Sequence, residues 1–185
     1  MAEQSVAAQA LLTAEFDTPV GTLAVVTAPD ASGDRPAGPE GPVAASGFRP
    51  LAEVLDDLPQ QYHGRRAESA ELPVVAAAVA RFATGDVAAF DSVSVAIAGP
   101  EFRVATWRAM REIPAGQVRT YAELAAAAGR PRAARAAGSA CATNPVAPFV
   151  PCHRVVPTGG GVGNYGFGPQ VKAALLAAEG FPGGV

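Results

Sequence analysis

The residues best suited to chemistry lie in one short stretch, "VPCHRVV" (150–156), where Cys152 directly precedes His153. A cysteine becomes a strong nucleophile when a base accepts its proton, usually a histidine that a carboxylate orients. His153 is one of only two histidines in the chain. Glu179 falls in the last turn of an expected helix, where the helix dipole disfavours a carboxylate. Because adjacent side chains usually diverge, we expect His153 to act on Cys152 through a water molecule.

Two other interpretations of Cys152 remain open at this point. A cysteine in an apolar run is most often an inert, buried thiol. A zinc site would need further ligands, and the chain offers only Cys141, His63 and His153, without C-x-x-C spacing. The residues alone therefore favour a nucleophile over a structural thiol only narrowly, and they argue against a closed zinc site.

A second stretch of interest is "GGGVGNYGFG" (159–168), which interleaves glycines with Tyr165 and Phe167. Glycines at this density allow the backbone to approach a partner closely, and the aromatic rings suggest a flat one. The stretch is not a phosphate-binding loop, because no GKS or GKT follows it. The alternative is a loop whose aromatic rings pin it to the core.

Two short helices are expected to precede the cysteine. Thr120 and Glu123 form a capping box, so a helix should begin at Tyr121 and end at Gly129. We expect a second helix from Pro131 over "PRAARAAGSACATN", carrying Arg132 and Arg135. The pair is typical of a helix-turn-helix, although ordinary helical hairpins share the pattern.

The rest of the chain predicts an α+β protein with two domains. Strands are expected in "AEFDTPVGTLAVVTA", "VAASGF" and "SVSVAIAG", and helices in "LAEVLDDL" and "LPVVAAAVARFATG". These form a small N-terminal α/β domain, 1–99, with a mobile loop at 29–42. A mostly helical domain, 100–185, follows and ends in the helix "PQVKAALLAAEG".

Charge is distributed unevenly along the 185 residues. Residues 101–154 hold eight arginines and three glutamates (8 − 3 = +5), whereas residues 1–100 hold five arginines and thirteen acids (5 − 13 = −8). This asymmetry suggests an anionic partner for the basic half, despite a net charge of −3. No apolar run is long enough to cross a membrane, and no basic leader precedes one. With only two cysteines, we expect free thiols and a reducing cytoplasm.

Taken together, these motifs resemble the O6-alkylguanine-DNA alkyltransferase family, the methylated-DNA–protein-cysteine methyltransferases. The resemblance rests on "PCHRVV", "GNYGFG" and "KAALLAAEG", with "TYAELA", "RAARAAG" and "NP" upstream in the family's order. It covers about residues 100–181 closely and the first hundred only loosely. It implies a ribonuclease H-like N-terminal domain followed by a winged helix-turn-helix-like domain.

The resemblance also implies an activity and its catalytic residues. Cys152 would accept the alkyl group of O6-methylguanine, and of O4-methylthymine, in a single turnover without a cofactor. His153 would deprotonate Cys152 through water, with Glu179 orienting His153. Asn144 would brace the backbone around the cysteine, and Tyr121 would protonate or hydrogen-bond N3 of the departing guanine.

For DNA, the resemblance implies binding of duplexes in the minor groove, with the damaged nucleotide flipped out. Arg135 would fill the vacated space, and Tyr165 would wall the base pocket. Backbone groups of Val155 and Gly166 would read the base edge. The remaining DNA- or base-contacting positions are Arg132, Ala133 and Cys141, the last a small apolar filler on the second helix. We expect a monomer, no membrane contact and no metal, since the cysteines and histidines of zinc-bearing relatives are missing.

Two rival functions are weighed against this resemblance. A cysteine hydrolase would need an oxyanion hole, and no papain-like or caspase-like signature surrounds Cys152. A helix-turn-helix regulator with a reactive thiol would explain the charge, but it leaves Tyr121, Asn144 and Glu179 without roles.

Overall fold

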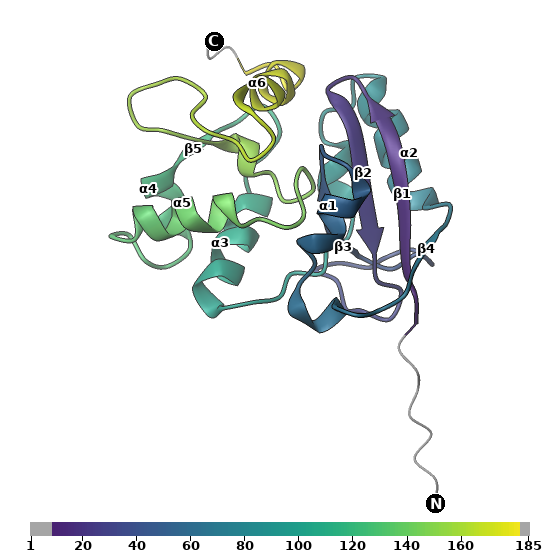
Figure 1. Cartoon of the computed structure of the whole chain (residues 1–185). Helices are drawn as coiled ribbons and strands as arrows, with labels where there is room; N and C mark the ends of the chain where they lie inside the picture. Colours follow the sequence, from purple (N-terminus) through teal and green to yellow (C-terminus); the bar gives the residue numbers. More distant parts are fainter. Residues whose placement is uncertain (1–8, 182–185) are drawn as a thin grey trace, which may run out of the picture.

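The structure, a computed structural model, describes residues 9–181. Its strands are β1 (Leu11–Thr18), β2 (Gly21–Thr27), β3 (Val43–Gly47), β4 (Ala67–Ser69), β5 (Arg119–Thr120) and β6 (Val155–Val156). Its helices are α1 (Leu51–Asp56), α2 (Pro73–Ala83), α3 (Glu101–Arg111), α4 (Tyr121–Ala127), α5 (Ala134–Ala142) and α6 (Pro169–Ala178). Three short 3₁₀ turns, η1 (Gln60–Tyr62), η2 (Ala89–Ser92) and η3 (Cys152–Arg154), complete the set (Figure 1). The mixed α and β composition agrees with the predicted class.

A four-stranded sheet in the order β3-β2-β1-β4 dominates the N-terminal half. The predicted hairpin is confirmed: β1 and β2 pair antiparallel from Leu12 opposite Thr27 to Thr18 opposite Gly21. Gly21 has a φ of 132°, a conformation that suits glycine at this turn. Strand β4 pairs parallel to β1 and was not predicted, because "AES" shows no apolar alternation.

Both faces of this sheet are buried. Leu23 and Val25 of β2 face the cluster that contains α2, whereas Ala24 and Val26 face the cluster that contains Val54 of α1. The two helices therefore cover opposite faces of the sheet (Figure 1). Burial on both sides explains why β2 reads as a continuous apolar run rather than an alternating one.

The predicted strand at "SVSVAIAG" is wrong as a regular strand. Only Val95 forms an isolated bridge, to Val43 of β3. The hydrogen bonds of this segment are divided between two partners: Ala96 N donates to the Val43 carbonyl, and Asp34 N donates to the Val95 carbonyl. Because the segment is shared between β3 and the 29–42 loop, no continuous ladder forms.

The C-terminal half contains helices α3, α4, α5 and α6. The capping box at Thr120 and Glu123 is present as predicted, and α4 begins at Tyr121. Helix α5 begins at Ala134 rather than Pro131. A turn precedes it, in which Ala133 N donates to the Arg130 carbonyl, so Arg132 lies before the helix.

The two halves share a continuous core. One cluster of buried apolar side chains runs from β2 and α2 through α3, α4 and α5 to Cys152 and α6. A bridge joins Ser46 of β3 to Val146, close before the cysteine. Within residues 9–181, no helix is both long and apolar enough to cross a bilayer.

Candidate active site

Cys152 opens η3, a single turn in which all three residues are buried. Its side chain is 6% exposed. Directly after η3, Val155 and Val156 form β6, which pairs in parallel with β5. Because β5 leads straight into α4, this short pairing brings the cysteine turn close to the start of α4 and to Tyr121.

Asn144 holds the cysteine turn from the end of α5. Its Nδ2 donates to the Val150 carbonyl at 2.8 Å and to Sγ of Cys152 at 3.1 Å. Its Oδ1 accepts the Val146 backbone N–H at 3.1 Å. The one amide therefore braces the loop before the cysteine and also places a donor on the sulfur.

His153 contacts Glu179 at the end of α6. Its Nε2 lies 3.0 Å from Oε1 of Glu179, and both side chains are almost fully buried. Since the carboxylate can only accept, Nε2 carries the proton in the neutral ring and Nδ1 keeps its lone pair. Nδ1 is buried and has no partner among the described residues. This nitrogen is therefore free to act as a base.

Arg154 neutralises Glu179, an arrangement that the sequence analysis missed. Its Nη2 donates to Oε1 of Glu179 at 2.8 Å, and its Nε lies 3.1 Å from both carboxylate oxygens. Nη1 donates to Asp91 and to the Ile113 carbonyl, each at 2.8 Å. The guanidinium thus ties Glu179 at the active site to Asp91 in the N-terminal half.

These contacts shift the pKa values of the site in a consistent way. Burial alone would raise the pKa of Glu179, but hydrogen bonds from His153 and Arg154 outweigh it and hold that pKa at about 2. Burial lowers the pKa of His153 although Glu179 opposes the shift, so the ring is neutral near pH 7. Burial raises the pKa of Cys152, against the hydrogen bond from Asn144 and the charge of Lys172. The resting site therefore pairs a thiol with a neutral imidazole.

Lys172 of α6 is buried and is a second residue that the sequence analysis missed. Its Nζ donates to the Val155 carbonyl at 2.6 Å and lies 3.4 Å from the Asn164 carbonyl. No carboxylate pairs with it within residues 9–181. Burial lowers the pKa of Lys172, and the neighbouring Cys152 and Cys141 raise it.

A cavity of about 360 Å³ lies over the cysteine, a volume in the usual range for small-ligand sites. It brings together four predicted site residues with Cys152, namely Tyr121, Cys141, Tyr165 and Gly166, and Gly138, Ala142 and Asn164 complete its lining. Burial raises the pKa of the Tyr121 hydroxyl, so it stays protonated and able to donate. The cavity thus has a thiol, a phenol donor and a second aromatic wall.

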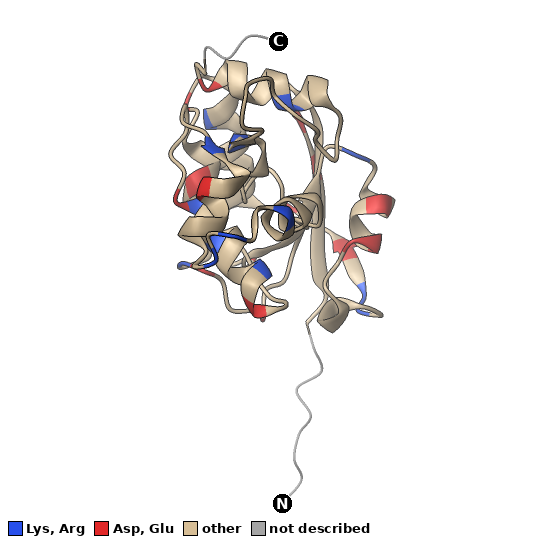
Figure 2. Ribbon diagram, turned by 90° about the vertical axis from the view of Figure 1, so that its left-hand side faces the viewer, with Lys and Arg blue, Asp and Glu red and all other residues tan. Residues whose placement is uncertain are grey.

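Four of the predicted DNA- or base-contacting residues lie outside this cavity. Arg135 is exposed on α5, Arg132 is exposed in the turn before it, and Ala133 is the N-cap residue of α5. Val155 is buried in β6, where its carbonyl accepts from Lys172 and keeps a second lone pair. Figure 2 shows the side of the molecule that carries α4 and α5, where Lys and Arg segments outnumber acidic ones.

Two of the eight arginines between residues 101 and 154 are not available to a partner. Arg154 is buried as described above. Arg111 is also buried, with Nε donating to Asp34 at 3.0 Å and its other nitrogens to the Phe149 and Val93 carbonyls at 2.8 Å each. The surface arginines therefore number six (8 − 2), so the local charge of +5 overstates the basic surface.

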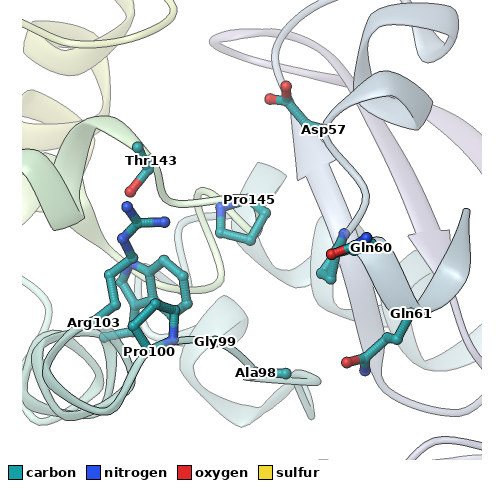
Figure 3. Close-up of a pocket in the computed structure, with 11 residues that line it drawn as sticks. Asp57, Gln60, Gln61, Ala98, Gly99, Pro100, Arg103, Thr143 and Pro145 are labelled. Carbon is teal, nitrogen blue, oxygen red and sulfur yellow. The ribbon is translucent and has the colours of Figure 1, made fainter.

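A larger cavity of about 690 Å³ lies away from the cysteine. Figure 3 shows Asp57, Gln60 and Gln61 on one wall and Arg103 and Thr143 on the other. Its lining includes no cysteine or histidine. Within the part of the chain that the structure describes, no group of three or more His, Cys, Asp or Glu side chains could hold a metal ion.

The sequence carries a usable signal for Lys172. Positions 172, 175, 176 and 179 share one face of α6, and Leu175 and Leu176 are the apolar members of that face. A lysine and a glutamate on an apolar stripe indicate buried charges. Arg154 carries no such signal, because its partners Asp91 and Ile113 are remote in sequence.

Comparison with known proteins identifies the family. Residues 101–181 match the model described as "6-O-methylguanine DNA methyltransferase, DNA binding domain". The methylated-DNA–protein-cysteine methyltransferase of Salmonella typhimurium is 38% identical over 135 residues, which cover 72% of this chain and 79% of the relative. The Mycolicibacterium paratuberculosis protein of the same name is 38% identical over 145 residues, which cover 76% of this chain and 87% of the relative.

Solved structures agree along almost the whole chain. The Mycobacterium tuberculosis O6-methylguanine methyltransferase aligns with a TM-score of 0.66 and 27% identity, covering 92% of each chain. The OGT of the same organism in complex with DNA aligns with a TM-score of 0.69 and 26% identity, covering 91% of this chain and 92% of that one. Because the Salmonella and Mycolicibacterium relatives are 38% identical to the chain and are covered over 79% and 87% of their length, the chain belongs to the methylated-DNA–protein-cysteine methyltransferase family.

Proposed function

We propose that this chain repairs DNA by moving the alkyl group from O6 of guanine to its own Cys152. The observation that carries the proposal is the cavity of about 360 Å³, which joins the Cys152 thiol to Tyr121 and Tyr165. His153 follows Cys152 in the same turn and contacts Glu179, and its unpartnered Nδ1 is the base. Relatives named for this activity share 38% identity with the chain.

The reaction follows from these groups as a displacement at carbon. The Cys152 proton passes through a water molecule to Nδ1 of His153, and Glu179 stabilises the imidazolium that forms. Sγ then attacks the alkyl carbon, a C–S bond forms, and the C–O6 bond breaks with its electron pair moving into the guanine. Tyr121 donates a proton to N3, so guanine leaves neutral, and His153 returns its proton to the phenol through solvent.

The product explains why each molecule would act once. The thioether on Cys152 has no proton to lose and is a poor leaving group, so the thiol is not restored. No cofactor takes part, because the lesion itself supplies the alkyl group. Methyl transfer from O4-methylthymine would follow the same displacement at carbon.

We further propose how the lesion reaches the cysteine. A base inside a duplex must leave the stack, at a cost of a few kcal/mol. Arg135 is exposed on α5 and does not line the cavity, which suits a side chain that fills the vacated space from the minor groove. Arg132 and Ala133, just before α5, would contact the backbone of the same DNA.

The finer architecture is part of the same proposal. We assign residues 1–99 to a ribonuclease H-like domain and 100–185 to a winged helix-turn-helix-like domain, in which α4 and α5 form the helix pair. The protein would act as a monomer in the cytoplasm, where a reducing environment keeps Cys152 as a thiol.

The test is to incubate the purified protein with a short duplex that bears one O6-methylguanine and to measure intact and peptide masses. We expect one methyl group per molecule, confined to the peptide that contains Cys152. Cys152→Ala should abolish the gain. Cys141→Ala is the matched control, because this second thiol lines the same cavity and should not be needed. Lesion binding without transfer would instead indicate a sensor or regulator and would refute the proposal.

A further inference from the structure

Gly47, the last residue of β3, lies directly against the ring of Phe167. A Cβ at position 47 would come within 2.6 Å and 2.7 Å of two ring carbons, far inside contact distance. Gly47 does not have a positive φ, so its backbone conformation does not require glycine. The close approach of Phe167 is what leaves no room for a side chain.

Phe167 is held by two more residues that follow Gly47. The Phe48 ring meets it edge-on, with centroids 5.9 Å apart and an angle of 80° between the rings. The Arg49 guanidinium lies 5.5 Å from the Phe167 centroid, and it also pairs with Asp57 after α1. The ring therefore sits in a socket that the N-terminal half provides.

On its other side, Phe167 packs against Tyr165, the aromatic wall of the active-site cavity. Their centroids are 5.3 Å apart, at 74°. The Tyr165 hydroxyl is buried beside the Cys152 sulfur, but it meets the full geometry of a hydrogen bond with none of the described residues, so the ring depends on its packing against Phe167. Glycines at 159, 160, 161, 163 and 168 have positive φ and give the surrounding loop little stiffness of its own.

The same N-terminal segment also holds the chain that leads to the cysteine. Ser46 Oγ donates to the Ala147 carbonyl at 2.8 Å, and Ser46 N donates to the Pro145 carbonyl at 2.8 Å. Residues 145–147 lie between Asn144 and Cys152. Residues 46–49, which we call the 46–49 segment, thus contact Phe167, which packs behind the Tyr165 wall of the cavity, and also the chain that leads to Cys152.

We propose that the 46–49 segment positions the base pocket: through Phe167 it holds Tyr165 against Cys152 and so sets the width of the cavity. This inference rests on the proposed alkyl transfer and gives the N-terminal half a defined part in it. Gly47 and Phe167 are positioning residues, since they act through Tyr165 and do not touch the reacting atoms.

The test uses Gly47→Ala, Phe167→Ala and the double variant. Gly47→Ala pushes the Phe167 ring away, and Phe167→Ala removes it, so both free Tyr165. We expect each to slow transfer from a saturating O6-methylguanine duplex by about tenfold or more, because small misplacements in a site are costly. In the Phe167→Ala background, Gly47→Ala should add nothing, because the group with which it clashes is gone.

A second readout separates this inference from the proposed function. A looser wall should expose Cys152, so labelling of Cys152 by iodoacetamide should become faster in both single variants while transfer becomes slower. Affinity for an undamaged duplex should stay at the wild-type value, since the segment does not include α5. If the wild type transfers no alkyl group, the proposed function fails, but the labelling rates still test the segment.

The matched control is Val54→Ala, which removes core volume on the opposite face of the sheet. It should lower the urea midpoint of unfolding without changing the rate of alkyl transfer or of iodoacetamide labelling. This result would show that lost stability alone does not cause the changes in the two single variants. The inference would be overturned if Gly47→Ala transferred the alkyl group and labelled Cys152 at the same rates as the wild type. It would also be overturned if Gly47→Ala slowed transfer as much in the Phe167→Ala background as it does alone.

Discussion

At the scale of single residues, Glu179 is the most consequential charge in the site. It accepts from His153, Arg154 and the Gly116 backbone, and its pKa falls from an ordinary 4.5 to about 2. A carboxyl with a lowered folded-state pKa stabilises the fold above its unfolded pKa, and that stability is lost as pH falls. The relevant window therefore runs from about pH 4.5 down to about pH 2.

We therefore predict a pH-dependent cost for Glu179→Gln. Near pH 7 it should lower the free energy of unfolding by on the order of 3 kcal/mol, because it removes one of the two carboxylates that pair with the buried Arg154 guanidinium. The difference from wild type should shrink as pH falls through the window above. Urea unfolding at several pH values measures it, and a constant difference down to pH 2 would contradict the assignment.

Lys172 offers a test of how the buried thiol ionises. Within residues 9–181 its ammonium has backbone carbonyl partners but no acidic one, so a thiolate at Cys152 is the charge that it would stabilise. Lys172→Met keeps the aliphatic stem and removes the charge. We expect the pKa of Cys152 to rise further, which slows thiolate alkylation at pH 7 by about tenfold.

The measurement is the rate of iodoacetamide labelling of Cys152 as a function of pH. A loss of packing alone would change the rate at all pH values, whereas a lost charge moves the midpoint of the profile. An unmoved midpoint in Lys172→Met would mean that Lys172 only ties Val155 to the rest of the fold.

At the scale of elements, α5 carries the residue that we expect to replace the flipped base. Arg135→Ala should slow transfer from duplex DNA by about tenfold or more, because nothing then compensates for unstacking. Transfer from a single-stranded oligonucleotide should be nearly unchanged, since that base needs no extrusion. The control is Arg132→Ala, which lies one turn away and before the helix. It should weaken DNA binding, but it should not slow transfer from the duplex more than transfer from the single strand. Equal losses on both substrates would exclude the assigned role for Arg135.

Elements with local signals could be predicted from the sequence, and elements with remote partners could not. The capping box at Thr120 and the turn before Gly21 depend on residues only a few positions apart, and both are present. The 92–99 segment alternates like a strand but divides its hydrogen bonds between Val43 and Asp34. Helix α5 starts late because the Arg130 carbonyl closes a turn first.

In the candidate site too, residues with a local sequence signal could be predicted and residues with remote partners could not. Cys152 and His153 are neighbours in a distinctive run, and Glu179 stands out by its place in a helix. Arg154 was counted as part of a basic surface, yet it is buried between Glu179 and Asp91. Burial is set by the whole fold, so a sequence count of charges cannot distinguish a surface arginine from a buried one.

At the scale of the whole molecule, the basic surface predicts how binding responds to salt. Each phosphate contact by an arginine releases counterions, so affinity for an undamaged duplex should fall as salt rises. Removing a surface arginine such as Arg130 should flatten the plot of log affinity against log salt by roughly one unit. Fluorescence anisotropy at several salt concentrations measures it, and an affinity independent of salt would refute an electrostatic contact.

The separation of acids and arginines has a further effect before any contact forms. Residues 1–100 carry a formal −8 and residues 101–154 a formal +5, and a shared apolar core joins the two halves. Such a molecule has a large electric dipole moment. In the field of a duplex it feels a torque as well as an attraction, so it turns its arginine-bearing side forward as it approaches. Encounters through the acidic end are repelled, and the search for a rare lesion loses little time to wrongly oriented collisions.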